Sequence, residues 1–357
     1  MDFIKKFLLK LLLSVILIVS FLICSYFFLK NEINKPINSY KGDLIIDIGK
    51  GNNIRDIFKI FKSNNIIKNQ LVYYFAVYSI NNYVPKYGQY NIPNNLSISH
   101  ILDILNSGKV IQYKITIPEG LTTLETISKI RDNKLLTGEI NKEFSKLEGL
   151  FLPETYYFYK GYTRDDLLNR MKNDMQKILD NGWNNRVGNL PYKTKYDVLK
   201  MASIIESEAG AEPEKKLIAS VFINRLNKNM RLQSDPTVLY GLEKLKKNKI
   251  KIIKKSHLRT DHAWNTYTRN GLPKSPISNP GRSSINAALN PFQTSYYYFV
   301  ADRKGGHLFA KSLSEHNKNI LYLKQNDLLE LNDNKSVFSN NNQLPSKKPI
   351  FNKLKIK

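Results

Sequence analysis

The sequence predicts an α+β protein: an N-terminal transmembrane helix, a small module of strands and helices, and then a larger mixed α+β domain. Three observations predict this organisation. Residues 11–29 form an apolar run without charge. Residues 43–120 alternate between strand-like and helix-like patterns. Residues 196–225 contain two helical patterns joined by a turn, and we expect the rest of the chain to be arranged around them.

The first element is a membrane anchor. The uncharged run from Leu11 to Leu29 is long enough to span a bilayer. Three lysines precede it, so the positive-inside rule places residues 1–10 in the cytoplasm and all later residues outside it. A cleaved signal peptide is the alternative, but the run exceeds an ordinary h-region and no A-x-A-like site follows. We therefore expect an uncleaved single-pass anchor, with a polar linker at 30–42.

Composition limits the classes of protein to consider. The formal net charge is +25, but the lysines are spread along the chain and no nucleic-acid motif accompanies them. We therefore expect no nucleic-acid partner. The only cysteine, Cys24, lies inside the predicted anchor, so an intramolecular disulfide is impossible. The exported part must be held together by its apolar core, which its length allows as two units.

The segment 43–120 is predicted to be a strand–helix module with an internal duplication. A strand at 43–48 is followed by Asn53, a typical helix N-cap, and then by apolar residues at helical spacing. The same order recurs at a constant offset of 44 residues, with three superposed pairs: Ile48 and Ile92, Ile54 and Ile98, Ile57 and Ile101. A further strand at 110–117 alternates apolar and polar residues.

The larger domain begins with a helix and an aromatic turn. Thr122 and Glu125 have capping-box spacing, which predicts a helix starting near Leu124. The stretch EGLFLPETYYF at 148–158 is a turn around a proline. Two interpretations stay open for it: a buried turn, or a turn from which Glu154 and Tyr156 face a cleft.

Glu206 is the first candidate for catalysis. On a helix from Tyr196, with Gly210 near its end, Glu206 lies on or beside the apolar face, whereas Glu208 points the opposite way, towards solvent. Burial penalises the charged form of a carboxyl group, and small neighbours leave room for a substrate, which suits a general acid. The alternative is a buried structural carboxylate that is paired with an arginine or caps a loop.

Polar residues after this helix are candidates for substrate binding. They are Gln233, Ser234, Asp235, Asn265 and Tyr267. Asp235 is alternatively the cap of a helix that begins at Pro236. The Pro- and Gly-rich loop 271–281 is expected to form the wall of a polar groove rather than packed core. Helix 283–289, strand 296–301 and a second strand near His307 follow.

Several standard chemistries are excluded. The sequence contains no G-x-S-x-G motif, no phosphate-binding glycine loop and no H-E-x-x-H motif. Its five histidines have no recognised metal-ligand spacing. We therefore expect no metal site and no cofactor.

An ordered series of motifs carries a family resemblance. In chain order they are ASIIESEAG, VFINRL, LQSDPTVLYG, WNTY, GLPKSPISNPG, INAALNP, YYYFVA and GGHLFAKSLSEHN. ITIPEGLT and EGLFLPETYYF also look like signatures of the same family. Over roughly residues 40–320 the chain closely resembles the endolytic murein transglycosylase family, also called YceG-like.

The resemblance implies a cell inner-membrane enzyme with an extracytoplasmic (periplasmic) domain. It implies a LysM-like module at 43–120 and a catalytic domain at 121–325, and it maps the catalytic glutamate onto Glu206. The implied activity cleaves MurNAc–GlcNAc bonds inside nascent peptidoglycan strands, leaves 1,6-anhydro-MurNAc ends and so limits glycan elongation alongside penicillin-binding-protein synthases. The basic, Asn-rich tail 326–357 matches nothing and is expected to be disordered.

The chemistry of the residues agrees with this resemblance. A hydrolytic glycosidase normally needs two carboxylates, whereas a lytic transglycosylase needs one, because the 6-hydroxyl of the sugar replaces water. Two alternatives remain open. One is a muramidase that hydrolyses the same bond with Asp235 or Glu154 as the second carboxylate. The other is a non-catalytic, membrane-anchored scaffold that binds glycan.

Overall fold

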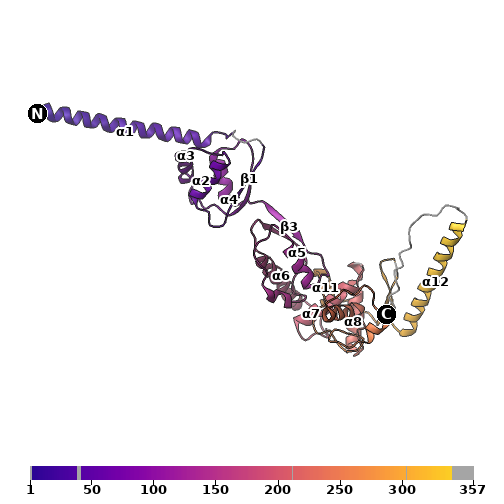
Figure 1. Ribbon diagram of the computed structural model, residues 1–357. Helices are drawn as coiled ribbons and strands as arrows, with labels where there is room; N and C mark the ends of the chain where they lie inside the picture. The colour runs from indigo at the N-terminus through magenta and orange to yellow at the C-terminus, as the bar shows by residue number, and fades with distance from the viewer. Residues whose placement is uncertain (1, 38–41, 211, 303, 340–357) are drawn as a thin grey trace. The chain divides into compact units, whose positions relative to one another are not determined.

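The computed structural model describes residues 2–37, 42–210, 212–302 and 304–339 (Figure 1). The chain divides into two compact units: unit 1 comprises Met1–Lys114 and Tyr157–Tyr162, and unit 2 comprises Ile115–Tyr156 and Thr163–Lys357. The division runs through a two-stranded ribbon formed by β3 (Gln112–Thr116) and β4 (Thr155–Tyr159). The predicted fold class, mixed α+β with a long apolar helix at the N-terminus, is confirmed.

The N-terminal helix α1 (Asp2–Asn34) is longer than the predicted anchor. It is long and apolar enough to cross a membrane, and its apolar stretch is not buried within the protein. It continues five residues past Leu29 into the predicted linker and ends before Pro36, which cannot continue a helix. Residues 38–41 of that linker lie outside the described residues.

Unit 1 contains the predicted duplication. Strand β1 (Leu44–Ile48) and helix α2 (Ile54–Ser63) recur as β2 (Gly88–Ile92) and α4 (Ile98–Ser107), each shifted by 44 residues. Asn53 caps the first helix in a capping box, and Ser97 caps the second. The two strands pair antiparallel. Helix α3 (Gln70–Tyr78) lies between the two copies in the chain and has no counterpart in the predicted duplication.

The core of unit 1 forms between the two copies. Large side chains from both copies and from α3 are fully buried there: Ile57, Phe61, Tyr73, Tyr90, Ile101 and Leu105. The predicted alternation of β3 is also present, because Ile115 is buried whereas Gln112, Lys114 and Thr116 are exposed.

Unit 2 is mainly helical. Its helix α5 (Thr123–Arg131) begins at the predicted capping box, in which Thr122 and Glu125 satisfy each other's backbone. The other elements, in chain order, are η1 (Lys142–Lys146), α6 (Arg164–Asn184), α7 (Lys195–Glu208), η2 (Glu212–Glu214), α8 (Lys215–Asn227), α9 (Asp235–Lys246), α10 (Lys255–Arg259) and α11 (Arg282–Leu289).

Helix α7 lies at the centre of unit 2. Thr194 and Asp197 form a capping box at its start, and six apolar residues between Val198 and Ile205 are buried. The helix contacts α6, α8, α9 and α11, and Figure 1 shows it close to α8 and α11. A helix surrounded in this way holds its last turn, which carries Glu206, in a fixed position.

Unit 2 ends with a hairpin and a long helix. Strands β5 (Tyr298–Ala301) and β6 (His307–Ala310) pair antiparallel where strands were predicted. Helix α12 (Leu313–Ser339) extends beyond residue 325 into the predicted tail, whose disorder stays a prediction. The remainder of the predicted tail, 340–357, lies outside the described residues.

Candidate active site

Glu206 lies in the last turn of α7 with a side chain that is 9 % exposed. One carboxylate oxygen accepts hydrogen bonds from the Gly281 backbone N–H at 2.9 Å and from the Ser284 hydroxyl at 2.7 Å. The other faces the Lys215 ammonium at 3.3 Å. The predicted position beside the apolar face is therefore confirmed, and the partner cation is a lysine rather than an arginine.

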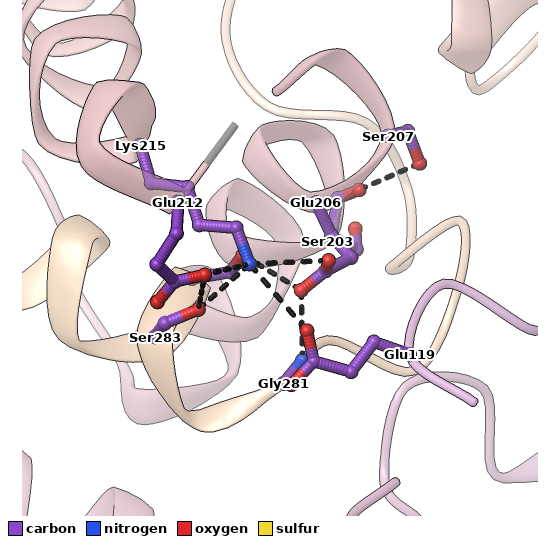
Figure 2. A network of polar contacts seen from close by, with 9 residues as sticks. Glu119, Ser203, Glu206, Ser207, Glu212, Lys215, Gly281 and Ser283 are labelled. Atoms are coloured by element: carbon purple, nitrogen blue, oxygen red, sulfur yellow. Dashed lines mark hydrogen bonds and ion pairs between the residues drawn. The ribbon is translucent and has the colours of Figure 1, made fainter. Parts of the chain in front are cut away.

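Lys215 gathers the polar groups of the site (Figure 2). Its ammonium donates to the Ser283 hydroxyl at 2.7 Å and lies 3.2 Å from Glu212 and 3.5 Å from Glu119. Lys215 is 7 % exposed, whereas Glu119 and Glu212 are 44 % and 65 % exposed. A buried cation is thus shared by three carboxylates, two of which reach solvent.

Burial, hydrogen bonds and neighbouring charges shift the pKa values of three groups in this cluster. Burial raises the pKa of Glu119, and the nearby Glu206 carboxylate raises it further, against the opposing effect of Lys215. Burial acts to lower the pKa of Lys215, but attraction to Glu206 and Glu119 outweighs it and the pKa is raised. The Ser283 hydrogen bond lowers the pKa of Glu212. The pKa is therefore raised at Glu119 and lowered at Glu212, so Glu119 binds a proton more readily than Glu212 does.

Two glycines let Glu119 approach the other groups. Gly120, directly after it, has φ +79°, a conformation that favours glycine. Gly281 has an ordinary φ of −77°, but a Cβ there would overlap the Glu119 carboxylate. The bare Gly281 backbone therefore leaves room for Glu119 while its N–H donates to Glu206.

The loop 271–281 is hydrogen-bonded to α7, and its last part is packed core. Residues 276–281 are buried, which contradicts the prediction that this loop is poor core material. Ile277 N–H donates to the Ser203 hydroxyl at 3.0 Å, three residues before Glu206. Asn279 donates to Leu121 O and accepts from Phe151 N–H at 3.0 Å. These hydrogen bonds to neighbouring segments give buried polar groups of the loop a partner, which is why their burial is tolerated.

The predicted binding residues after α8 form a separate network. The Ser234 hydroxyl donates to Glu208 at 2.6 Å, and the Tyr267 hydroxyl donates to Asp235 at 2.6 Å. Glu208 is therefore half-buried and hydrogen-bonded, not directed freely into solvent as predicted. Asp235 is the first residue of α9, and its N-cap is Ser234, so Asp235 is not the cap. Burial and Asp235 raise the pKa of Tyr267.

Gln233 and Asn265 hold loops in place. Gln233 has φ +53° and accepts from the buried Arg225 at 3.4 Å. Asn265 is 1 % exposed; its amide donates to Leu258 O and Thr260 O, and its oxygen accepts from Tyr267 N–H. Each group of the Asn265 side chain is thus used inside the protein, which indicates a structural role.

The two interpretations of the turn at 148–158 apply to different residues. Tyr156 is 2 % exposed and donates to Leu152 O at 2.9 Å, so this residue belongs to a buried turn. Glu154 is partly exposed and forms an ion pair with Arg282 at the start of α11. Neither residue contacts Glu206 in the hydrogen bonds and ion pairs of the described residues.

Sequence reasoning missed Glu119, Lys215, Ser283 and Ser284. Glu119 lies in ITIPEGLT, a stretch noticed only as a signature, and the Pro–Glu–Gly turn was the available signal. Lys215 was hidden among neighbouring charges at the start of α8, where a solvated lysine is the ordinary expectation. The proximity of Glu119 and Glu206, 87 residues apart in the chain, requires the tertiary structure.

The arrangement suits proton transfer to and from a neutral substrate. A buried carboxyl, a half-exposed carboxyl and a hydroxyl surround one ammonium. Within the described ranges, no group of three or more His, Cys, Asp or Glu side chains is arranged to hold a metal ion.

Comparison with known proteins identifies the family. The YceG-like family model matches residues 46–321. The endolytic murein transglycosylase of Bacillus subtilis is 32 % identical over 304 residues, covering 76 % of this chain and 82 % of that protein. That of Streptococcus pneumoniae D39 is 27 % identical over 77 % of this chain and 57 % of its own length. A crystal structure of a YceG-like protein from Listeria monocytogenes is 29 % identical, covers 78 % of this chain and 99 % of that one, and superposes with a TM-score of 0.45. Since the family model spans most of the sequence, the chain belongs to the YceG-like family.

Proposed function

We propose that this protein is an endolytic lytic transglycosylase that cleaves the MurNAc–GlcNAc bonds of peptidoglycan, with Glu206 as the catalytic acid and base. The names of its relatives support the reaction. The observation that carries the residue assignment is the burial of Glu206 between Lys215, Gly281 and Ser284, in a cluster that opens to solvent at Glu119.

The reaction needs two proton transfers, one from Glu206 and one back to it. Protonated Glu206 donates to the glycosidic oxygen as the bond from that oxygen to the anomeric carbon of MurNAc breaks. The 6-hydroxyl of the same MurNAc then attacks the anomeric carbon, and its proton returns to Glu206. The products are a free 4-hydroxyl on GlcNAc and a 1,6-anhydro-MurNAc end, and no water is consumed.

Lys215 and Glu119 set the charge around this proton. Lys215 stabilises the carboxylate that Glu206 becomes after donation. Glu119 opposes that effect, because its negative charge close to the same ammonium favours a proton on the cluster. In this proposal, seven further residues hold the loops around the site in position: Gln233, Ser234, Asp235, Asn265, Tyr267, Glu154 and Tyr156.

A muramidase is the second candidate, because Glu119 is a second carboxylate in the same cluster as Glu206. The two carboxylates of a hydrolytic glycosidase flank the scissile bond and act separately. Glu119 and Glu206 instead converge on a single ammonium, which favours one proton-handling cluster. For this reason the transglycosylase is the proposed function.

Mass spectrometry of a short digest of purified glycan strands in heavy-oxygen water tests the proposal. Long fragments with 1,6-anhydro-MurNAc ends and no heavy oxygen are expected. Reducing ends that carry heavy oxygen would mean hydrolysis, and uncut strands that remain bound would mean a scaffold. Either result overturns the proposed reaction.

The proposal extends to location and partners. Helix α1 anchors the chain once in the cell membrane, with residues 1–10 in the cytoplasm and the catalytic domain outside. The strand–helix module is the LysM-like part and binds glycan, and penicillin-binding-protein synthases supply the nascent strands. Reporter fusions placed after α1 and at the C-terminus should both indicate export, and a cytoplasmic signal from either contradicts this topology.

A further inference from the structure

Helix α3 has an exposed apolar face that the proposed glycan chemistry does not use. Its sequence, QLVYYFAVY, contains no charged residue. Val72, Tyr73, Ala76 and Val77 are buried in unit 1. On the other side, Leu71 is 73 % exposed and Tyr78 is 80 % exposed, and with Phe75 they form a stripe at helical spacing. A helix that is apolar all round is unusual where one side faces water.

This face continues the surface of α1. The rings of Phe75 and Tyr26 contact edge to face, with centroids 5.8 Å apart. Leu71 lines a shallow hollow together with Phe21, Cys24 and Phe28 of α1. Phe21 lies eight residues before Leu29, which at 1.5 Å per residue is about 12 Å inside the end of the uncharged run.

A second hollow marks where the polar level begins. It is lined by Glu32 and Lys35, at the end of α1, and by Lys68, just before α3. Charged residues at the end of α1 and just before α3 therefore lie close together. Apolar residues of α1 and α3 lie together nearer the start of α1. The uncharged run of α1 is about as long as the hydrocarbon core of a bilayer is thick, so little of it can extend beyond the lipid.

We propose that the stripe Leu71, Phe75 and Tyr78 docks into the lipid bilayer beside α1, at the boundary between headgroups and acyl chains. The occupant is lipid, because the stripe is continuous with the surface of α1 that lipid covers. Tyrosine at that depth keeps its ring in the apolar layer and its hydroxyl at the headgroups. The docked helix holds unit 1 at a fixed height above the membrane. This inference rests on the membrane anchor of the proposed function.

Spin labels on single cysteines test the docking in the full-length protein. Cys24, the native cysteine, reports on α1 itself. In a Cys24→Ser background, Leu71→Cys and Tyr78→Cys report on the stripe, and Ile45→Cys and Val84→Cys are controls at exposed apolar positions elsewhere in unit 1. Each protein is reconstituted into phosphatidylglycerol–phosphatidylethanolamine vesicles. Collisions of the label with oxygen, which enters lipid, and with a water-soluble nickel chelate are then compared.

Labels at 24, 71 and 78 should favour oxygen at least several-fold over the nickel chelate, and labels at 45 and 84 should show the reverse. If position 24 favours oxygen but 71 and 78 favour nickel, the anchor stands and the docking is wrong. If position 24 also favours nickel, the anchor itself is wrong. Shielding of 71 and 78 from both reagents would mean a protein partner and would also overturn the proposal, as would an oxygen preference at all five positions. Equal melting temperatures in detergent show that the variants fold.

Discussion

The Lys215 ammonium lies 3.3 Å from the Glu206 carboxylate, and less than a tenth of either side chain is exposed. The same ammonium also forms ion pairs with Glu119 and Glu212, so three carboxylates share one cation. A substitution at any member of this cluster therefore alters the charged surroundings of Glu206.

Glu206→Gln should abolish most of the activity and keep the fold. The amide is nearly isosteric and still accepts from Gly281 and Ser284, but it cannot donate and recover a proton at neutral pH. We expect the rate of glycan cleavage to fall by about 10²–10⁴-fold. The matched control is Glu208→Gln on the same helix, which keeps the oxygen that accepts from Ser234 and should retain the parent rate. Parent-like cleavage by Glu206→Gln would refute the assignment.

Lys215→Met should destabilise unit 2. Removing one partner of a buried ion pair typically costs about 3–5 kcal/mol, and the lower end applies because Glu119 and Glu212 can turn towards water. The loss, measured by denaturant unfolding, should shrink as the pH falls, since protonated carboxyls need no counter-charge. Lys216→Met, one residue on, is the control and should change stability little. An equal effect of both substitutions would show that Lys215 holds no special position.

Glu119→Gln should change how stability depends on pH. The pKa of Glu119 is raised in the folded protein, so the folded state binds its proton more tightly than the unfolded state. Stability from this group is therefore present below its ordinary pKa of 4.5 and is lost as the pH rises through the folded value. Relative to the parent, Glu119→Gln should gain stability as the pH rises above about 4.5. A difference that stays constant across pH would contradict the raised pKa.

Gly281→Ala displaces Glu119 without changing any charge. The added methyl group overlaps only the flexible end of Glu119, and φ at this position suits alanine. The variant should fold, and the pH dependence of its stability should change in the same direction as that of Glu119→Gln. If Gly281→Ala keeps the parent's pH dependence of stability while Glu119→Gln does not, the raised pKa of Glu119 does not depend on its position beside Lys215.

Asn279→Ala should be more damaging than its loop position suggests. The side chain is fully buried, and its loss removes the acceptor of the Phe151 N–H, whereas the Leu121 carbonyl still accepts from the Asn279 backbone N–H. Each unsatisfied buried group costs about 1–3 kcal/mol. Asn270→Ala, at an exposed position nearby in the chain, is the control. Thermal unfolding should separate the two variants by several degrees, and equal melting temperatures would contradict the role of Asn279 as a support.

Local signals in the sequence were sufficient for much of the fold. Asn53, Thr122 and the constant offset of 44 residues predicted helix starts and a duplication that the structure confirms. These features depend on neighbours in the chain. The periodicity of α7 likewise predicted that Glu206 lies beside the apolar face.

The site itself could be predicted only in part. Glu119 and Lys215 reach Glu206 from other segments, and periodicity within one helix contains no information about such contacts. Ser234, Asp235 and Tyr267 looked like binding residues because they are polar and close in the chain to loops. In the structure, Ser234 donates to Glu208 and Tyr267 donates to Asp235. The sequence does not contain these partners, so it could not show that the residues support loops.

The pairing of β1 with β2 has a consequence for the origin of unit 1. Ile46 pairs with Tyr90, the residue 44 positions later, which is its own equivalent in the second copy. Leu44 pairs with Ile92 and Ile48 with Gly88, so exchanging the copies reproduces the same register. Such self-complementary pairing is the geometry of a two-fold symmetric dimer. The module therefore has the form of two subunits fused into one chain, in which neither copy has a strand partner of its own, and a peptide that contains only the first copy should form a homodimer or stay unfolded.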